Sequence, residues 1–342
     1  TYWRNVNMKI KEIAEHLHLS VSTVSKALNG GFDVSQETKA MVLEYAQKHG
    51  YKAHDERLTL KKIRRLCFLY DNMDSTQAST IVPLSLAFSK YANGAKFEVI
   101  SNSTDAITTT YNQFMKKNHF DGAFIAGLNY KSALLSQLKD TVYPTVLYDN
   151  VLIGKKIANI NNENINTIYN LFMKLYQLGH RKIGFIHGDK DSFTSNERFS
   201  GYIIGLVTTN LQYNSNYVFF GKFSEQAGYE AANFFAKTDV TAIICSADII
   251  AVGLLRGLQT LNFKVPEDIS ITGFDDLEFS KYTNPPITTV KQDIDLIGET
   301  ALSLLLSMMK NRSSQRIVLH GEIVYRNSIG PMQERKKILE KK

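Results

Sequence analysis

From residue 66 onward, short apolar runs alternate with longer stretches in which apolar residues repeat at helical spacing. The apolar runs predict β-strands and the longer stretches predict helices. The first round of this alternation places strands at 66–70, 97–101, 123–125 and 145–147, with helices at 79–93, 107–117 and 131–138. Strands separated by helices pair in parallel and need both faces of their sheet covered. We therefore expect an α/β fold with parallel, doubly wound sheets.

A second round of the same alternation follows a long amphipathic stretch at 162–178. It places strands at 182–186, 217–220, 242–245 and 269–273, with helices that begin at 196, 225 and 248. Two such sheets predict two similar lobes, the first formed by about 66–160 and 290–320 and the second by about 161–289 and 321–330. Ligands bind at the carboxyl ends of parallel strands, so the cleft between the lobes is the expected site.

Residues 8–50 show helical periodicity only. One apolar stripe runs from Ile10 to Leu17 and a second from Val21 to Leu28, and only three residues separate them. Ser20 is a good N-cap for the second helix, and a third helix is expected after Ser35. Three short helices with a tight turn between the first two follow the helix-turn-helix plan.

The net charge of +7 is concentrated at the two ends of the chain. Residues 1–65 carry 12 basic and 7 acidic side chains, residues 66–332 carry 23 and 24, and residues 333–342 carry 5 and 2. A basic, patterned head on a nearly neutral body favours a nucleic-acid partner for the head. The basic tail at 333–342 has too few apolar residues for a coiled coil, so we expect the assembly to stop at a homodimer.

Several other classes of protein are disfavoured. No apolar run is long enough to span a membrane and the first residues lack a signal-peptide core, so we expect a cytoplasmic protein with no membrane partner. Cys67 and Cys245 lie in apolar runs without metal-ligand spacing, which argues against disulfides and zinc. His180 and His187 have no accompanying nucleophile motif. We expect no enzyme activity, no metal and no cofactor.

Specific motifs resemble the LacI/GalR family of transcriptional repressors. The head reads IKEIAEHLHLSVSTVSKALN at 10–29, VSQET at 34–38 and GY at 50–51. The body reads LGHRKIG at 178–184, NERFSGY at 196–202, DISITGFDD at 268–276 and PPITTVKQ at 285–292. The resemblance covers about residues 8–330. It implies an all-α helix-turn-helix headpiece at 8–50, a hinge linker with a short hinge helix at 51–65 and a two-lobed, periplasmic-binding-protein-like core at 66–330.

The resemblance implies that the second helix enters the major groove of operator DNA. Residues expected to read base edges are Val21, Ser22, Ser25 and Lys26. Residues expected to contact phosphates are Ser20, Thr23, Asn29, Ser35, Thr38, Tyr51 and Arg57. For any single Ser or Thr, helix capping is the competing interpretation.

The hinge departs from the family pattern. Relatives with Ala-Arg-x-Leu insert the leucine into the minor groove, and the aligned residues here run from Arg57 to Leu60 with a leucine, Leu58, at the arginine position. We expect Leu60 to be the wedge and Arg57 to replace the missing phosphate contact. Leu58 is the rival wedge.

The two-lobed core implies a sensor for a small molecule, which in this family is usually a sugar or another small metabolite. The matching positions are Asp149, Arg198, Phe223, Asp248 and Gln292, with Asp71 as a weaker candidate. Arg198 can donate paired hydrogen bonds to hydroxyls, and Phe223 can stack on a sugar ring. Competing interpretations make Asp248 a helix cap and Phe223 a core residue. Asp275 and Asp276 are expected to order a loop.

These features together predict a sequence-specific repressor whose operator affinity is regulated allosterically by a small molecule, most simply a sugar, in the cleft. The alternative is a repressor of the same type that responds to a phosphorylated partner protein. A periplasmic sugar-binding protein would need a signal peptide and would lack the headpiece, and an enzyme would need a nucleophile and a base.

Overall fold

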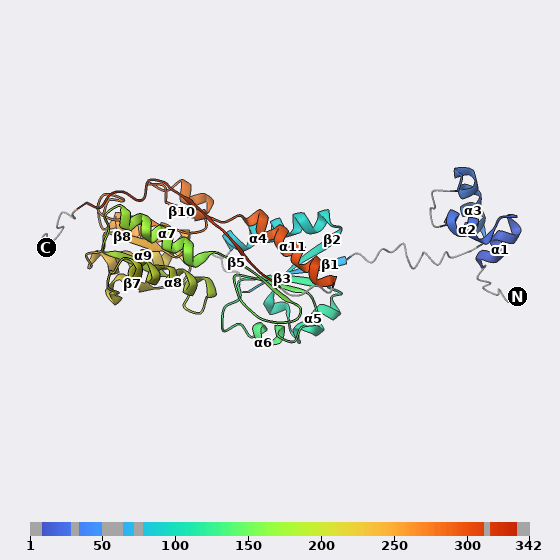
Figure 1. Cartoon of the computed structure of the whole chain (residues 1–342), viewed down its shortest axis with the longest axis horizontal. Coiled ribbons are helices and arrows are strands. Elements are labelled where there is room, and N and C mark those ends of the chain that lie inside the picture. The colour runs from blue at the N-terminus through green and yellow to red at the C-terminus, as the bar shows by residue number, and fades with distance from the viewer. Residues whose placement is uncertain (1–8, 29–33, 50–63, 72–77, 311–314, 334–342) are drawn as a thin grey trace. The chain divides into compact units, whose positions relative to one another are not determined.

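The computed structural model describes residues 9–28, 34–49, 64–71, 78–310 and 315–333. The chain divides into two compact units, Thr1–Ile63 and Arg64–Lys342 (Figure 1). Each unit has its own buried core.

The first unit contains three short helices, as predicted. They are α1 (Ile10–His16), α2 (Val21–Leu28) and α3 (Gln36–Lys48). Its core is small and takes two buried residues from each helix: Ile13, Ala14, Val24, Ala27, Val42 and Ala46. The turn between α1 and α2 is tight because His18 adopts a left-handed backbone conformation with φ of 52°. This is helix-turn-helix geometry.

The second unit contains two lobes, each built on a parallel sheet. The first sheet has the strand order β11-β5-β4-β3-β1-β2. Its strands are β1 (Arg64–Tyr70), β2 (Phe97–Ser103), β3 (Gly122–Ala126), β4 (Thr145–Tyr148), β5 (Ile157–Asn162) and β11 (Arg316–Leu319). Its helices are α4 (Ala78–Gly94), α5 (Tyr111–Lys117), α6 (Leu134–Leu138) and α11 (Ile294–Met309).

Helices cover both faces of this first sheet (Figure 1). Alternate residues of β1 show the arrangement: Leu66 and Phe68 pack with α4 and α11, while Cys67 and Leu69 pack with α5 and α6. All four residues are fully buried, which explains why β1 reads as a continuous apolar run in the sequence.

The second lobe repeats this plan with a four-stranded sheet in the order β7-β6-β8-β9. Its strands are β6 (Ile183–His187), β7 (Val218–Phe220), β8 (Ala242–Cys245) and β9 (Ser270–Thr272). Its helices are α7 (Asn164–Gln177), α8 (Phe193–Thr208), α9 (Glu225–Ala236) and α10 (Asp248–Thr260), and β10 (Thr289–Lys291) pairs with β12 (Glu322–Val324) beside the sheet. Helices α7 and α8 pack on one face of the sheet, and α9 and α10 on the other.

The chain passes between the lobes after β5, after β10 and after β11. In both sheets all strands run parallel, so the carboxyl ends of each set of strands share one edge. These edges carry the loops that meet between the lobes.

The helices of the second lobe approach closely at glycines. A methyl group on Gly253 of α10 would overlap the backbone carbonyl of Glu225 in α9, and one on Gly228 of α9 would overlap the carbonyl of Ile250 in α10. Backbone atoms cannot move aside as a flexible side chain can, so only glycine permits this helix spacing.

We expect Gly253→Ala to lower the free energy of unfolding by about 3 kcal/mol, because the helices must separate to accommodate the methyl group. Urea denaturation of the full chain measures this loss. Gly94→Ala is the matched control, since nothing lies within 4 Å of a Cβ at that helical position and alanine favours helix. Equal stability of the two variants would contradict the packing argument.

Some elements differ from the sequence-based expectation. Strand β5 was not predicted, because it carries three asparagines, and the long helix expected from residue 162 begins at Asn164 instead. The amide of Asn159 exchanges hydrogen bonds with the backbone of Leu152, which makes a buried polar residue acceptable in a strand. The helix expected from 107 begins at Tyr111, because Thr110 forms a capping box with Gln113.

Candidate functional site

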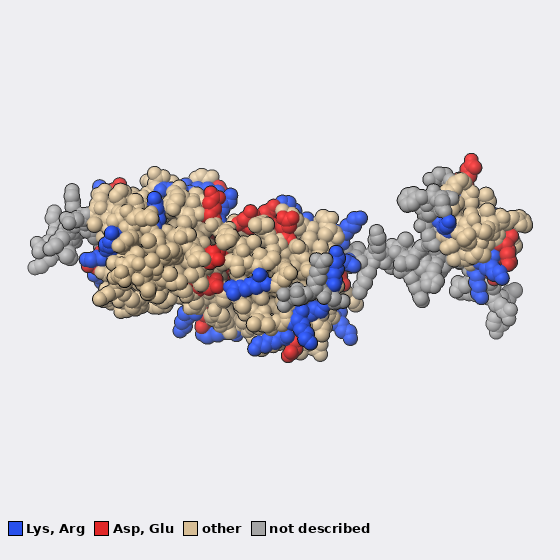
Figure 2. Space-filling view, viewed as in Figure 1, with Lys and Arg blue, Asp and Glu red and all other residues tan. Residues whose placement is uncertain are grey.

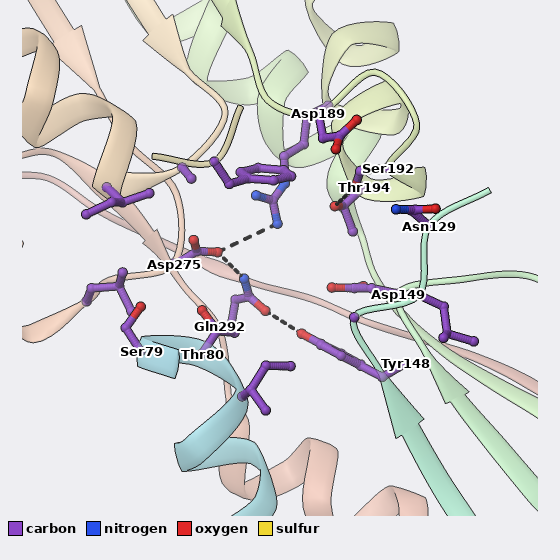
Figure 3. A pocket seen from close by; sticks show the side chains of 18 residues that line it. Ser79, Thr80, Asn129, Tyr148, Asp149, Asp189, Ser192, Thr194, Asp275 and Gln292 are labelled. Carbon is purple, nitrogen blue, oxygen red and sulfur yellow. Dashed lines mark hydrogen bonds and ion pairs between the residues drawn. The ribbon is translucent and has the colours of Figure 1, made fainter. Parts of the chain in front are cut away.

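A cavity of about 170 Å³ lies between the two lobes. Figure 3 shows its side chains, which come from both sheets and from the crossing after β10. The lining residues of the first lobe are Ser79, Thr80, Ile81, Gly127, Leu128, Asn129, Tyr148 and Asp149. The remaining ones are Asp189, Ser192, Thr194, Arg198, Phe223, Ala247, Ile249, Asp275, Leu277 and Gln292. Concave sites with apolar walls and a few convergent polar groups are typical of small-molecule binding.

Arg198 projects from α8 and is held rigidly. Its side chain is only 4% exposed, and its guanidinium lies 3.6 Å from the ring centroid of Phe274. Nε donates to Asn164 at 2.9 Å, and Nη1 donates to the carbonyl of Ser246 at 2.6 Å. Nη2 lies 3.7 Å from Asp275, the nearest carboxylate. The guanidinium is therefore fixed in position before a ligand arrives.

Gln292 connects the two lobes through its side-chain amide. Its Oε1 accepts hydrogen bonds from Tyr148 at 2.6 Å and from Asn162 at 2.7 Å, both in the first lobe. Its Nε2 donates to Asp275 of the second lobe at 2.5 Å. The dashed lines in Figure 3 follow part of this network, from Arg198 through Asp275 and Gln292 to Tyr148. A change at one lobe can thus be transmitted to the other through fixed hydrogen bonds.

Two carboxylates of the cavity have unusual proton affinities. Burial raises the pKa of Asp149 to about 7, although the positive charge of Arg198 opposes the shift. Burial also raises the pKa of Asp275 to about 6, again opposed by Arg198. Asp149 follows β4 with a left-handed φ of 54°, a conformation that is uncommon outside glycine and concentrates at functional sites. Both carboxylates can accept hydrogen bonds from ligand hydroxyls once ionised.

Phe223 supplies an aromatic wall over a glycine. A Cβ on Gly188 would lie 2.6 Å from the Phe223 ring and equally close to the Ser195 hydroxyl, so glycine is required beneath the ring. The Ser195 hydroxyl is buried and has no hydrogen-bond partner among the described residues. The ring is part of the cavity lining, as a stacking residue would be.

Two of the six residues expected to bind effector do not line the cavity. Asp71 follows β1, but its carboxylate accepts hydrogen bonds from Thr104 at 2.7 Å and Ser132 at 2.5 Å, which ties neighbouring loops together. Asp248 is fully buried and accepts from the hydroxyl of Thr289 at 2.5 Å and the backbone N–H of Leu277 at 2.8 Å.

Asp248 is not a helix cap either, since Ala247 occupies the N-cap position of α10. Its carboxylate holds the 275–277 loop in place, and burial raises its pKa to about 7. A methyl group on Gly273 would overlap this carboxylate. The position after a strand suggested an effector contact for Asp248, but its carboxylate bonds protein groups instead and does not line the cavity.

The loop after β9 contributes a side chain to the cavity, whereas the sequence predicted only that its two aspartates order the loop. Asp276 does order the loop, through an ion pair with Arg326. Asp275 lines the cavity, which sequence reasoning missed because the two carboxylates are adjacent. Tyr148, Asp189, Ser192 and Thr194 were also missed, and their only sequence signal was their place near the ends of β4 and β6.

Direct contacts join the lobes at the rim of the cavity. The backbone N–H of Tyr130 donates to the carbonyl of Asp191 at 2.9 Å, and Lys131 pairs with the Asp191 carboxylate at 2.5 Å. The rings of Tyr130 and Phe193 meet edge to face at 6.5 Å. We name Tyr130, Lys131, Asp191 and Phe193 the rim contact. It joins the two lobes beside the cavity.

The helix-turn-helix unit presents α2 as its candidate recognition helix. Val24 and Ala27 face the core, whereas Val21, Ser22 and Lys26 are exposed. Val21 is 48% exposed although it is apolar, which suits contact with a thymine methyl group. Ser25 is half-buried at the edge of the same face.

Several predicted phosphate-binding hydroxyls also cap helices. Ser20 Oγ accepts the backbone N–H of Thr23 at 3.0 Å, and Ser35 Oγ accepts that of Thr38 at 3.2 Å. Ser20 Oγ also lies 2.7 Å from the hydroxyls of Ser22 and Thr23, so a phosphate contact at Ser20 would have to replace one of these hydrogen bonds. Ser35 Oγ has one further hydroxyl partner, Thr38 at 2.8 Å, and can still bond a phosphate. The remaining predicted DNA contacts, Asn29, Tyr51, Arg57, Leu58 and Leu60, lie outside the described residues, as does the tail from residue 334.

The two histidines and two cysteines considered in the sequence analysis are buried. His180 bonds with Thr241 and the carbonyl of Gly330, and His187 bonds with the carbonyl of Gly188. Cys67 and Cys245 are buried and unpaired. Within the described ranges, no group of three His, Cys, Asp or Glu could hold a metal ion, and no helix has the length and apolar character to cross a membrane.

Comparisons with known proteins agree with this architecture. A model of bacterial regulatory proteins of the lacI family matches residues 9–54, and a model of periplasmic binding protein-like domains matches residues 172–329. The HTH-type transcriptional repressor PurR of Mannheimia succiniciproducens is 27% identical over 328 residues, which cover 94% of this chain and 98% of the relative. PurR of Pasteurella multocida is 27% identical over 329 residues, with the same coverage.

Solved structures share the fold of the whole chain. The transcriptional regulator CelR in complex with cellobiose has a TM-score of 0.71 and 22% identity, covering 94% of this chain and 99% of CelR. The lac repressor dimer bound to operator and the anti-inducer ONPF has a TM-score of 0.71 and 20% identity, covering 95% of this chain and all of that one. The motifs, the architecture and the matching models together show that this chain belongs to the lacI family of bacterial regulatory proteins.

Proposed function

We propose that the chain binds a pseudopalindromic operator as a homodimer, and that a small hydroxylated ligand in the cleft, a sugar or a close chemical relative, sets its operator affinity. The observation that carries the proposal is the arrangement of Arg198, Asp149, Asp275 and Gln292 around one cavity beside the Phe223 ring. Fixed donors and acceptors together with an aromatic ring match the two kinds of surface of a sugar.

Both lobes contribute these groups, which supports a link between binding and closure. Asp149 and Tyr148 belong to the first lobe, and Arg198 and Phe223 to the second. A ligand that contacts both sets favours the closed arrangement over an open one by its differential binding energy. By linkage, operator DNA and ligand then change each other's affinity by the same factor, typically worth about 1–3 kcal/mol.

Ligands of similar proteins support the sugar class. CelR was solved with cellobiose, and a lacI-family regulator of Enterococcus faecium with a TM-score of 0.69 was solved with ribose. The cavity of about 170 Å³ is below the roughly 300–1,000 Å³ of typical drug-sized sites, which favours a ligand of one small ring. The homodimer is supported by the dimeric lac repressor on its operator.

A thermal-shift panel of neutral, amino and phosphorylated mono- and disaccharides tests the ligand class. A ligand that binds only the folded protein raises its unfolding temperature. Each hit is then added to a gel-shift titration with operator DNA selected by the chain from a random-sequence library. A hit that stabilises the protein and changes operator affinity supports the proposal.

The opposite outcome is equally informative. Tight operator binding with no stabilisation by any sugar would overturn the small-ligand proposal and favour regulation by a phosphorylated partner protein. If the full chain selected no specific DNA sequence from the library, the proposal that it binds an operator would be contradicted.

Ligand affinity should depend on pH through the two cavity carboxylates. Ligand hydroxyls donate to ionised carboxylates, so ligand affinity is expected to rise with pH between about pH 5.5 and 7.5. The pKa of Asp275 is about 6 and that of Asp149 about 7. Below its own pKa, each carboxyl group contributes up to roughly tenfold in ligand affinity per pH unit. The free energy of unfolding of the ligand-free protein should fall as pH rises from about 4 to 7, because the unfolded chain releases these protons earlier.

Calorimetric titration at several pH values measures the ligand affinity, and urea denaturation at the same pH values measures the free energy of unfolding. Asp149→Asn is the matched variant, since asparagine tolerates the left-handed backbone and cannot titrate. It should remove the part of the affinity profile near pH 7 and leave the part near pH 6. A profile identical to that of the unmodified chain would exclude Asp149 as a ligand-binding group.

A further inference from the structure

The cations of the first lobe are gathered at one edge of its sheet. Residues 64–162 contain ten Lys and Arg, and eight of them lie at the amino ends of the strands or at the ends of the helices that lead into them. These eight are Arg64, Arg65, Lys96, Lys116, Lys117, Lys139, Lys155 and Lys156. Lys310, after α11, adds a ninth at the same edge. We name this set the basic edge.

The sheet topology explains how residues so far apart in sequence share one edge. All pairings of β1 to β5 and β11 are parallel, so every amino end points the same way. Contacts confirm the closeness: Arg65 donates to the carbonyl of Asn118 at 2.9 Å, and Lys156 donates to the carbonyl of Met308 at 3.2 Å. Arg64 and Lys156 line one hollow of about 270 Å³ there, together with Asp121. Figure 2 shows Lys and Arg gathered over the part of this lobe that carries α5 and α6.

Most of these charges are not neutralised by the protein itself. Arg65 pairs with Glu98 at 3.0 Å. Within the described ranges no ion pair is found for Arg64, Lys96, Lys116, Lys117, Lys139, Lys155 or Lys310, all of which are exposed.

Helix dipoles do not account for the arrangement. Cations stabilise helix C-termini, and Lys116, Lys117, Lys139 and Lys310 fit that explanation. Lys155 and Lys156, however, lie between two strands, and Arg64 begins a strand. At the opposite edge, by contrast, the acidic residues Asp71 and Asp149 follow the strands. The lobe is therefore electrically polarised, although the whole body of the chain is nearly neutral.

The basic edge is also where the DNA-binding unit is tethered. Arg64 is the first residue of β1, and residues 50–63 connect it to the helix-turn-helix unit. Fourteen residues can span at most about 50 Å, so DNA held by that unit stays at high effective concentration near the edge. The nine cations of this edge outnumber its acidic neighbours, which are Glu98, Asp121 and Asp140, and such an excess of exposed positive charge matches phosphates.

We infer that the basic edge binds the phosphate backbone of DNA that flanks the operator, without reading its sequence. The inference rests on the proposed function, in which the full chain binds an operator. It assigns the sensor body a direct share of DNA affinity and of its salt dependence, in addition to the share of the helix-turn-helix unit.

The test uses the full chain and two duplexes with the same selected operator, one ending at the operator and one extended by about 20 base pairs on each side. Binding constants are measured between 50 and 300 mM KCl for the unmodified chain and for Lys116→Glu/Lys117→Glu/Lys139→Glu. For the unmodified chain, the slope of log K against log salt should be steeper on the long duplex than on the short one by about 2–3. This difference corresponds to about three extra phosphate contacts.

The triple variant should lose this difference, bind the long duplex about tenfold more weakly at low salt, and bind the short duplex almost as the unmodified chain does. The matched control, Lys222→Glu/Lys237→Glu/Lys264→Glu, changes the net charge equally at exposed positions of the other lobe and should keep the difference. Equal slopes on both duplexes for the unmodified chain would overturn the inference and favour an acidic protein as partner. Binding of the short duplex reports separately on the proposed function.

Discussion

Replacing Arg198 with alanine is expected to abolish the response to ligand while leaving operator binding intact. Ligand affinity should fall by at least about 100-fold, because a charged, bidentate donor is lost from the cavity. The free energy of unfolding should also fall by about 3–5 kcal/mol near neutral pH, since Asp275 would remain buried without its cation. Calorimetric titration, urea denaturation and ligand-dependent gel shifts measure the three effects.

Arg198→Lys separates the loss of function from the loss of stability. Lysine keeps the charge near Asp275 but cannot reproduce the fork to Asn164 and Ser246 or the stacking on Phe274. This variant should fold, retain operator binding and still bind ligand weakly. A normal ligand-dependent change of operator affinity in either variant would show that the cavity is not the sensor.

Replacing Lys26 with alanine is expected to weaken operator binding by about 1–3 kcal/mol, or roughly 5- to 150-fold, and to relax specificity at one base pair. Lys26 is exposed on α2, on the opposite side of the helix from Val24 in the core. Lysine donates to guanine O6 or N7 when this helix occupies the major groove. Gel-shift titrations with the selected operator and with a scrambled duplex measure both affinities.

Lys11→Ala provides the control, because Lys11 is an exposed cation on α1 and its loss changes the net charge equally. It should weaken both duplexes slightly and by similar factors. If Lys26→Ala behaved in the same way, Lys26 would contact phosphates and another residue of α2 would read the bases.

Much of the fold could be predicted from periodicity because most strands and helices place their buried apolar residues at the spacing of their own secondary structure. Strand β1 is buried on both faces and so reads as an apolar run, and the helices of the first unit each show one apolar stripe. Strand β5 escaped prediction because its buried asparagines satisfy their amides through loop contacts that no local pattern encodes. Such partners become visible only once the loops are in place.

The resemblance to the family selected four residues that line the cavity, but it did not reveal in which direction a side chain after a strand points. Arg198, Phe223, Asp149 and Gln292 line the cavity as expected. Asp248 and Asp275 each lie near the carboxyl end of a strand, yet the first points into the core and the second into the cavity. Backbone conformation makes that choice, and Asp275 has a φ of 112° that the sequence does not reveal.

The rim contact has a consequence for how such a regulator can change over generations. Tyr130, Lys131, Asp191 and Phe193 hold the lobes together, yet none of them lines the cavity. Substitutions there alter the free energy of closure without altering which molecule fits. Under the proposed function, the ligand concentration needed for a response could therefore be changed by single substitutions at the rim contact while the lining of the cavity stays the same.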